Sequence, residues 1–320
     1  MTRYEFDLLR ADVPQPLDNP QALADRPVAA KVRSLAGDAA RFVPGDTLAN
    51  AINTAVCVGE PLLITGEPGT GKTQTAYYAA WKLSLGDVLH FQVKSDSNAK
   101  DLLYHFDMVR YFQDAHLGKL PVAAMGDQSE GALATKRNYR EKRALWQAFE
   151  DAEQRGVPRV LLIDEIDKAP RDFPNDLLHE LDQMEFQVLE TGEQVRVRPH
   201  LRPIVFITSN SERRLPEPFL RRCVYHHILF DSALLKRILT TRRDEFGTLS
   251  DGFLELAVER FLSLRERGLQ KAPSTGELLV WLRVLAAASD VSEAKLRDAD
   301  LTKLPYLGVL LKNRQDLLGE

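Results

Sequence analysis

One eight-residue segment constrains the fold of this chain more than any other. Residues 66–73 fit the pattern G-x-x-x-x-G-K-[ST], with an apolar run before them and helix-forming residues after them. The pattern indicates a phosphate-binding loop when a strand precedes it and a helix follows it. Glycines let such a loop curl so that its N–H groups point at a phosphate, and the helix start favours negative charge there. A glycine-rich turn without a ligand is the alternative reading.

The loop assigns chemistry to its last two residues. Lys72 would neutralise phosphate oxygens, and the hydroxyl of Thr73 would bind Mg²⁺. The residues expected to surround the phosphates are Gly66, Glu67, Pro68, Gly69, Thr70, Gly71, Lys72 and Thr73.

Polar residues also follow two further apolar runs. Asp164 and Glu165 end the run 160–163, and Asn210 follows the run 204–207. Ligands of α/β proteins bind at the carboxyl ends of strands, so Asp164 would hold Mg²⁺ together with Thr73. Glu165 would polarise an attacking water, and Asn210 would contact phosphate or hold that water. A solvated acidic turn and an Asn that merely forms a turn are the alternatives.

The order of the apolar runs predicts the fold class. From residue 46 to 230 they alternate with helical segments, which is typical of a parallel α/β sheet covered on both faces. The expected strands are 62–65, 88–93, 160–163, 204–207 and 224–230. One expected helix begins at Asp46 as its N-cap, a second runs from residue 72 towards residue 86, and a third spans 139–155. Residues 118–136 are expected to form a loop.

The two ends of the chain differ from this α/β region. Five prolines interrupt the first 45 residues, which we interpret as a lead-in without continuous helix or central strand. After residue 230 only helical periodicity remains, with apolar stripes at 234–239, 253–264 and 274–288. The expected domains are therefore a lead-in (1–45), an α/β core (46–230) and a small all-α lid (231–320).

Composition excludes several classes of protein. The 42 basic and 46 acidic residues give a net charge of −4, which argues against a general polycation for nucleic acid. Only two cysteines, Cys57 and Cys223, exclude a disulfide-rich scaffold. No apolar run approaches the roughly 20 residues that span a bilayer, and the N-terminus lacks the apolar middle of a signal peptide. We expect a cytoplasmic protein without a membrane partner.

The three strand ends, followed by a helical region, resemble the AAA+ ATPases, and within them most closely the MoxR-like ATPases. The resemblance covers about residues 45–285 and is carried by segments 61–73, 101–107, 139–152, 164–186, 189–199 and 203–210. It implies that residues 66–73 are a Walker A loop, that Asp164 and Glu165 belong to Walker B, and that Asn210 is the sensor 1 residue. The implied cofactors are ATP and Mg²⁺.

The resemblance also implies an active site completed by a neighbouring subunit. Residues 215–223 are similar to the segment that carries an arginine finger, and we favour Arg222 while keeping Arg221 as the alternative. A hexameric ring is implied, as is a partner protein, for which a von Willebrand factor A domain is one possibility. Residues 186–198 resemble a β-hairpin, and residues 94–105 a helix insertion, that face the pore in this clade. An ordinary surface hairpin is the alternative.

One position departs from the family pattern. MoxR-like lids carry an Arg that acts as sensor 2, and Gly276 stands at the matching position. Either nucleotide sensing is weakened, or Lys271 or Arg283 takes over the role. The glycine therefore puts the sensor 2 function in doubt for this chain.

The leading functional expectation is an AAA+ ATPase that hydrolyses ATP at subunit interfaces to remodel, assemble or activate a partner protein. A nucleotide-gated switch in a signalling or defence system is one alternative, and the missing sensor 2 Arg supports it. A nucleic-acid motor of a restriction-type system is another. The basic residues Arg196, Arg198, His200 and Arg202 have no interleaved aromatics, which favours a solvated face over a nucleic-acid contact.

Overall fold

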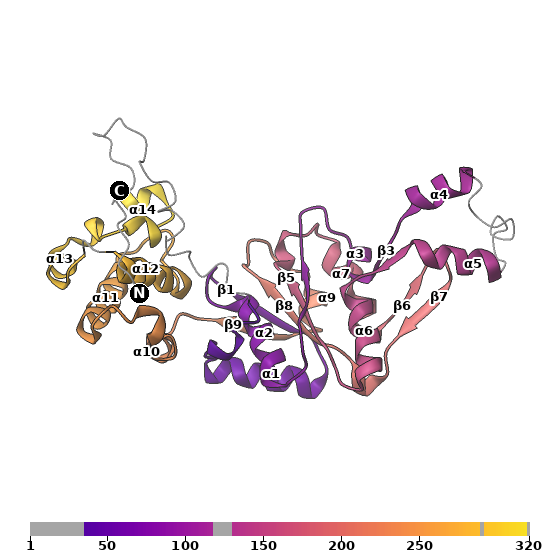
Figure 1. Ribbon diagram of the computed structural model, residues 1–320, viewed down its shortest axis with the longest axis horizontal. Coiled ribbons are helices and arrows are strands. Elements are labelled where there is room, and N and C mark those ends of the chain that lie inside the picture. The colour runs from indigo at the N-terminus through magenta and orange to yellow at the C-terminus, as the bar shows by residue number, and fades with distance from the viewer. Residues whose placement is uncertain (1–34, 118–129, 289–290, 319–320) are drawn as a thin grey trace. The chain divides into compact units, whose positions relative to one another are not determined.

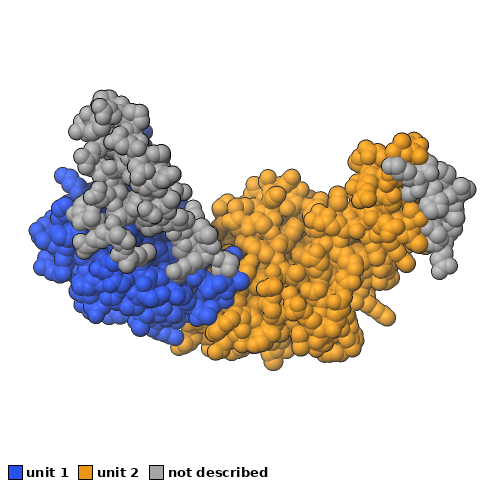
Figure 2. Space-filling model, in the orientation of Figure 1, with its two compact units in different colours: residues 1–43, 67–71, 229–320 blue, residues 44–66, 72–228 orange. Residues whose placement is uncertain are grey.

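The computed structural model describes residues 35–117, 130–288 and 291–318. The chain divides into two compact units: unit 1 comprises residues 1–43, 67–71 and 229–320, and unit 2 comprises residues 44–66 and 72–228 (Figure 2). Up to residue 34 the expected lead-in lies outside the described residues, and its remainder carries the 3₁₀ helix η3 (Ala39–Arg41). In the described ranges, no helix has the length and apolar character needed to cross a membrane.

A parallel sheet of five strands lies at the centre of unit 2 (Figure 1). Its strands are β1 (Leu62–Gly66), β2 (Leu89–Gln92), β5 (Val160–Asp164), β8 (Ile204–Ser209) and β9 (Val224–Ile228), in the order β2-β5-β8-β1-β9. All pairs are parallel, which confirms the predicted α/β fold and all five strands. The inner strands β1 and β5 are fully buried, whereas the edge strands β2 and β9 alternate in exposure.

The sheet is covered by helices that connect its strands. The helices of unit 2 are α1 (Asp46–Val58), α2 (Lys72–Lys82), α3 (Lys100–Leu103), α4 (Met108–His116), α5 (Glu130–Lys136), α6 (Ala144–Arg155), α7 (Phe173–Asp176), α8 (Leu178–Gln183) and α9 (Glu217–Leu220). Short 3₁₀ turns are η5 (Arg137–Tyr139), η6 (Ile166–Lys168) and η7 (Pro199–Leu201). Helix α2 packs on β1, β5 and β8, and α6 packs on β2 and β5.

Three local predictions were wrong. Asp46 is the first residue of α1 and not its cap, because Gly45 occupies the N-cap position. The helix expected from residue 139 begins at Ala144, because residues 140–142 form a strand instead. The loop expected at 118–136 lies outside the described residues up to 129, and its last seven residues form α5.

Two small antiparallel sheets extend from the core. Strand β3 (Tyr104–Phe106) pairs with β4 (Arg140–Lys142), so residues 94–105 end in a strand and contain only the short helix α3. Strand β6 (Glu185–Val188) pairs with β7 (Glu193–Arg196), which confirms the predicted hairpin. Both Val195 and Val197 are buried, and Leu189, beside the turn, is 74% exposed.

The C-terminal part of unit 1 is helical, as predicted for a lid. Its elements are α10 (Ser232–Thr241), η8 (Arg243–Phe246), α11 (Asp251–Arg265), α12 (Thr275–Ala287), α13 (Glu293–Asp298), η9 (Leu301–Lys303), η10 (Leu307–Val309) and α14 (Arg314–Leu318). Their apolar faces meet around the buried ring of Trp281 and form a core separate from that of unit 2. In α10 only Leu235 of the expected stripe is buried.

Candidate active site

The phosphate loop, residues 66–73, joins the end of β1 to the start of α2 in the predicted strand, loop and helix order. Gly69 and Gly71 have φ values of 79° and 93°, a region that side-chain-bearing residues rarely adopt. A Cβ on Gly71 would lie 2.9 Å from the ring of Phe42. A Cβ on Gly69 would clash with the hydroxyl oxygen of Ser274, so glycine is required at both positions by the backbone and by packing.

Lys72 is the first residue of α2 and is 7% exposed. Its ammonium group donates a hydrogen bond of 2.8 Å to the carbonyl oxygen of Gly66, across the curled loop. A buried ammonium is costly unless it has partners, so this position favours an anion beside it. The geometry suits the predicted contact of Lys72 with phosphate oxygens.

Thr73 and Asp164 are brought together from α2 and the end of β5. The Thr73 hydroxyl donates to the two carboxylate oxygens of Asp164 at 3.0 and 3.3 Å. Hydroxyl and carboxylate oxygens are the ligands that Mg²⁺ prefers, and they are held here at one point of a strand end. The residues present therefore fit the predicted Mg²⁺ ligands.

Two neighbours that the sequence did not single out complete the surroundings of Asp164. The hydroxyl of Thr208 donates to Asp164 at 2.5 Å, and His90 Nε2 lies 3.3 Å from the second carboxylate oxygen. Burial acts to raise the pKa of Asp164, but hydrogen bonds from His90, Thr208 and Thr73 outweigh it, so that the pKa is lowered. Asp164 is thus held as the anion that cation binding needs.

Glu165 lies in a cluster of polar side chains at the same edge of the sheet. Gln92 donates to its carboxylate at 2.7 Å, Lys168 at 2.5 Å and the amide of Asn210 at 3.3 Å. The backbone of Glu165 is left-handed, with φ of 60°, and its N–H donates to Thr208. The structure therefore brings the predicted Glu165 and Asn210 together and adds Gln92 and Lys168.

Asp167 and Lys168, in the turn that follows Glu165, bind different partners. Lys168 pairs with Glu165, and this hydrogen bond raises the pKa of Lys168. Asp167 is 2% exposed and accepts the backbone N–H groups of Asn210, at 3.1 Å, and Glu212, at 3.0 Å. Its role is to fix the chain that presents Asn210.

The two candidate finger arginines differ in their contacts. Arg222 donates to Asp182 at 2.5 Å and to the carbonyl oxygen of Pro218 at 3.1 Å. The Arg221 side chain is exposed and, among the described residues, bonds to no other group. Within the described ranges, neither arginine bonds to Asp164 or Glu165.

Within unit 1, Gly276 allows a close backbone approach. Its N–H donates to the carbonyl oxygen of Gly69 at 3.1 Å, and an added Cβ would lie at 3.1 Å from the same oxygen. Arg283, a suggested sensor 2 substitute, is paired with buried Glu245 at 2.6 Å. The backbone N–H of Lys271, the other suggested substitute, donates to the carboxylate of Asp316 at 3.1 Å.

Another residue that sequence reasoning missed is Arg265, at the end of α11. Its guanidinium lies 3.7 Å from the carboxylate of Glu67 in the phosphate loop and 3.9 Å above the ring centre of Phe230. No local sequence pattern predicts this contact, because it depends on how α11 packs in the folded chain. His90 and Gln92, in contrast, lie on β2, and Thr208 near the end of β8, where the strand-end rule that located Asp164 also applies.

Comparison with solved structures finds chains of low sequence identity. A candidate ATPase from Cytophaga hutchinsonii ATCC 33406 matches with a TM-score of 0.40 and 14% identity, over 90% of this chain and 83% of its own. NtrX from Brucella abortus, in complex with ATP, matches with a TM-score of 0.37 and 16% identity, over 87% of this chain and 55% of its own. Among curated proteins, none matches significantly.

The comparison with protein families is decisive. Residues 61–223 match the AAA domain of the dynein-related subfamily. This range runs from the residue before β1 to the residue before β9 and so contains the phosphate loop, Asp164, Glu165 and Asn210. Because the match takes in more than half of the 320 residues, the resemblance read from the sequence is confirmed and the chain belongs to the AAA family.

Proposed function

We propose that this protein is a Mg²⁺-dependent ATPase of the MoxR-like type that works as a ring, a hexamer by resemblance, and remodels or activates a partner protein. Membership of the AAA family supports the binding of ATP. The single observation that supports hydrolysis best is the cluster formed by Asp164, Glu165 and Asn210 at neighbouring strand ends with Thr73 of α2. The class of partner, such as a protein with a von Willebrand factor A domain, rests on the resemblance alone.

The residues of the site would have separate roles in the transfer of a phosphoryl group to water. Lys72 would bind the terminal phosphates, and Thr73 with Asp164 would hold Mg²⁺, which neutralises phosphate charge when bound. Glu165 would orient the attacking water and accept its proton, with Asn210 beside it to fix the water or the γ-phosphate. An arginine of the neighbouring subunit, Arg222 or Arg221, would stabilise the charge that develops on the transferred phosphoryl group.

The proposal is tested by measuring the ATPase rate against protein concentration, together with sedimentation in a slowly hydrolysed ATP analogue. Catalysis at subunit interfaces predicts that specific activity rises as the ring assembles. Glu165→Gln should keep ATP binding and lose turnover. A chain that binds ATP but stays monomeric, with negligible turnover at every concentration, contradicts hydrolysis at interfaces.

A second candidate, a nucleotide-gated switch, is favoured by one observation. Lys168 and Gln92 both bind the carboxylate of Glu165, so the expected base is restrained by its own chain. A switch would recruit its partner in the ATP form without turnover. Glu165→Gln would then preserve partner capture, whereas a remodelling enzyme with the same substitution would lose its product.

A further inference from the structure

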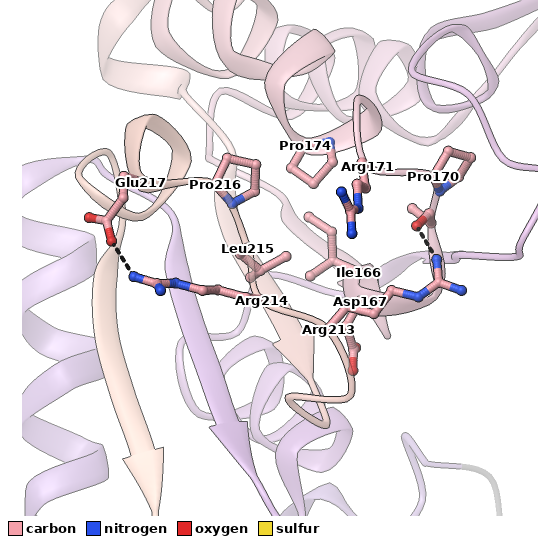
Figure 3. A pocket seen from close by; sticks show the side chains of 11 residues that line it. Ile166, Asp167, Pro170, Arg171, Pro174, Arg213, Arg214, Leu215, Pro216 and Glu217 are labelled. Carbon is pink, nitrogen blue, oxygen red and sulfur yellow. Dashed lines mark hydrogen bonds and ion pairs between the residues drawn. The ribbon is translucent and has the colours of Figure 1, made fainter.

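A cavity of about 630 Å³ opens in unit 2 beside the residues that follow Glu165 (Figure 3). Its wall comes from two segments: residues 166–174, which follow β5, and residues 213–217, which follow β8. Cavities of this size accommodate drug-sized ligands or short peptide segments. None of the predicted nucleotide-site residues lines it.

The lining of the cavity combines an apolar base with basic side chains. Ile166, Ala169 and Pro174 are buried, and Leu215 is half-buried. The basic side chains belong to Arg171, Arg213 and Arg214. Such a combination suits a ligand that has an apolar body and a negative group.

Among the arginines of the lining, Arg171 has no partner in the part of the chain that the structure describes. Among the described residues, the exposed guanidinium of Arg171 makes no hydrogen bond or ion pair. In Figure 3 it lies among the side chains of Pro170, Pro174 and Ile166, which line the same cavity. An arginine guanidinium is planar and carries several N–H donors. Beside an apolar wall, it is suited to bind a carboxylate through two parallel hydrogen bonds.

The other charged groups of the lining already have partners. Arg213 donates to the carbonyl oxygen of Ala169 at 3.2 Å, and Arg214 pairs with Glu217 at 2.9 Å. The carboxylate of Asp167 accepts backbone N–H groups and is 2% exposed. Because these charged groups are already paired, the positive charge of Arg171 favours an anion beside it.

We propose that this cavity binds a carboxylate carried on an apolar group, as presented by an acidic segment of the partner protein. The proposal rests on the proposed function, in which a partner is remodelled or activated. The 3₁₀ turn η6 joins Glu165 directly to the cavity, and Asp167 within it holds the backbone of Asn210. A bound segment would thus touch the chain that positions both residues expected to act on the attacking water.

The test uses a fluorinated fragment and the full chain in the presence of Mg²⁺ and ADP. Binding of 4-(trifluoromethyl)benzoate is followed by ¹⁹F NMR, with the uncharged 4-(trifluoromethyl)benzamide for comparison. We expect saturable binding of the benzoate and about tenfold weaker binding of the benzamide, because a hydrogen bond to a charged group is lost. Arg171→Gln should weaken the benzoate by about the same factor.

Arg297→Gln is the matched control, since Arg297 is also an exposed arginine but lies on α13, outside the cavity. It should leave binding unchanged. Equal binding of benzoate and benzamide, or an Arg171→Gln variant that binds like the wild type, would overturn the site. Because the readout is binding and not turnover, these results stay interpretable even if the chain hydrolyses no ATP.

A competition experiment then distinguishes a carboxylate carried by a peptide from one carried by a small molecule. The blocked dipeptide acetyl-Leu-Glu-amide should displace the benzoate, and acetyl-Leu-Gln-amide should not. If the benzoate binds at Arg171 but the acidic dipeptide fails to displace it, a peptide segment is not the ligand and the cavity serves a small carboxylate instead.

Discussion

At the scale of single residues, Lys168 forms the shortest of the described side-chain hydrogen bonds to Glu165, the expected catalytic base. It binds Glu165 at 2.5 Å, and both side chains are partly exposed. Lys168→Met removes the only charged partner among the three side chains described as binding Glu165. With this restraint weakened, we expect the basal ATPase kcat to rise about two- to fivefold, the range that an exposed ion pair supports. Lys168→Arg preserves the pair and should keep the wild-type rate. A Met variant that is slower than the Arg variant would show that Lys168 assists hydrolysis.

The two cysteines should differ sharply in reactivity. Burial raises the pKa of Cys223 to about 12, helped by Glu60 and Asp182, so its thiol stays protonated at pH 8. Cys57 is exposed. Titration with a thiol reagent at pH 8 should modify one thiol per native chain and two after denaturation. Cys57→Ser should remove the native reaction, and rapid labelling of native Cys223 would contradict the burial.

How much of the site was predictable depends on where each residue stands. Lys72, Thr73, Asp164 and Asn210 follow from motifs next to apolar runs, because a parallel sheet brings its strand ends to one edge. The role of Lys168 did not follow, because several acidic residues lie close to it in the chain and only the folded turn shows that it binds Glu165.

At the scale of elements, a buried carboxylate ties three segments of unit 1 together. The side chain of Glu245, in η8, is 2% exposed and accepts from Arg41 at 3.2 Å, Arg242 at 2.9 Å and Arg283 at 2.6 Å. Removing one member of a buried ionic cluster leaves charges unpaired, so Glu245→Ala should lower the free energy of unfolding by about 3 kcal/mol. Urea titration followed by circular dichroism measures this.

The neighbouring Asp244 provides the control for this prediction. It also pairs with Arg41, but its side chain is 59% exposed. Asp244→Ala should therefore cost less than about 1 kcal/mol. Equal losses for the two variants would mean that the contact with η3, and not burial of the cluster, carries the stability.

Elements that depend on the local sequence were predictable, whereas elements that depend on pairing with a distant segment were not. Strands β1, β5 and β8 were found because each is a short apolar run that the sheet buries. The edge strands β2 and β9 were found although they alternate in exposure. The start of α6 was misplaced because residues 140–142 pair with β3, more than thirty residues earlier in the chain, and helical periodicity does not register such a pairing. Gly45 was missed as the α1 cap because Asp46 offered the more familiar capping residue.

At the scale of the whole assembly, the proposed trans-acting arginine makes a prediction about mixtures. Lys72→Ala should abolish ATP binding, and Arg222→Ala should keep binding and lower turnover by about a thousandfold. In a random equal mixture, about a quarter of the interfaces in a ring pair an intact loop with an intact arginine, so part of the activity should return. Arg221→Ala is tested in the same way, because Arg222 is bound to Asp182 whereas Arg221 is exposed.

The control mixture combines Lys72→Ala with Glu165→Gln. Both residues belong to the same subunit's nucleotide site, so no arrangement of these two variants contains a complete interface and the mixture should stay inactive. Restored turnover with the arginine variant but not with Glu165→Gln requires a site shared between subunits. If neither arginine variant complements Lys72→Ala while each pure protein still forms rings, the active site is complete within one chain and the arginines serve another purpose.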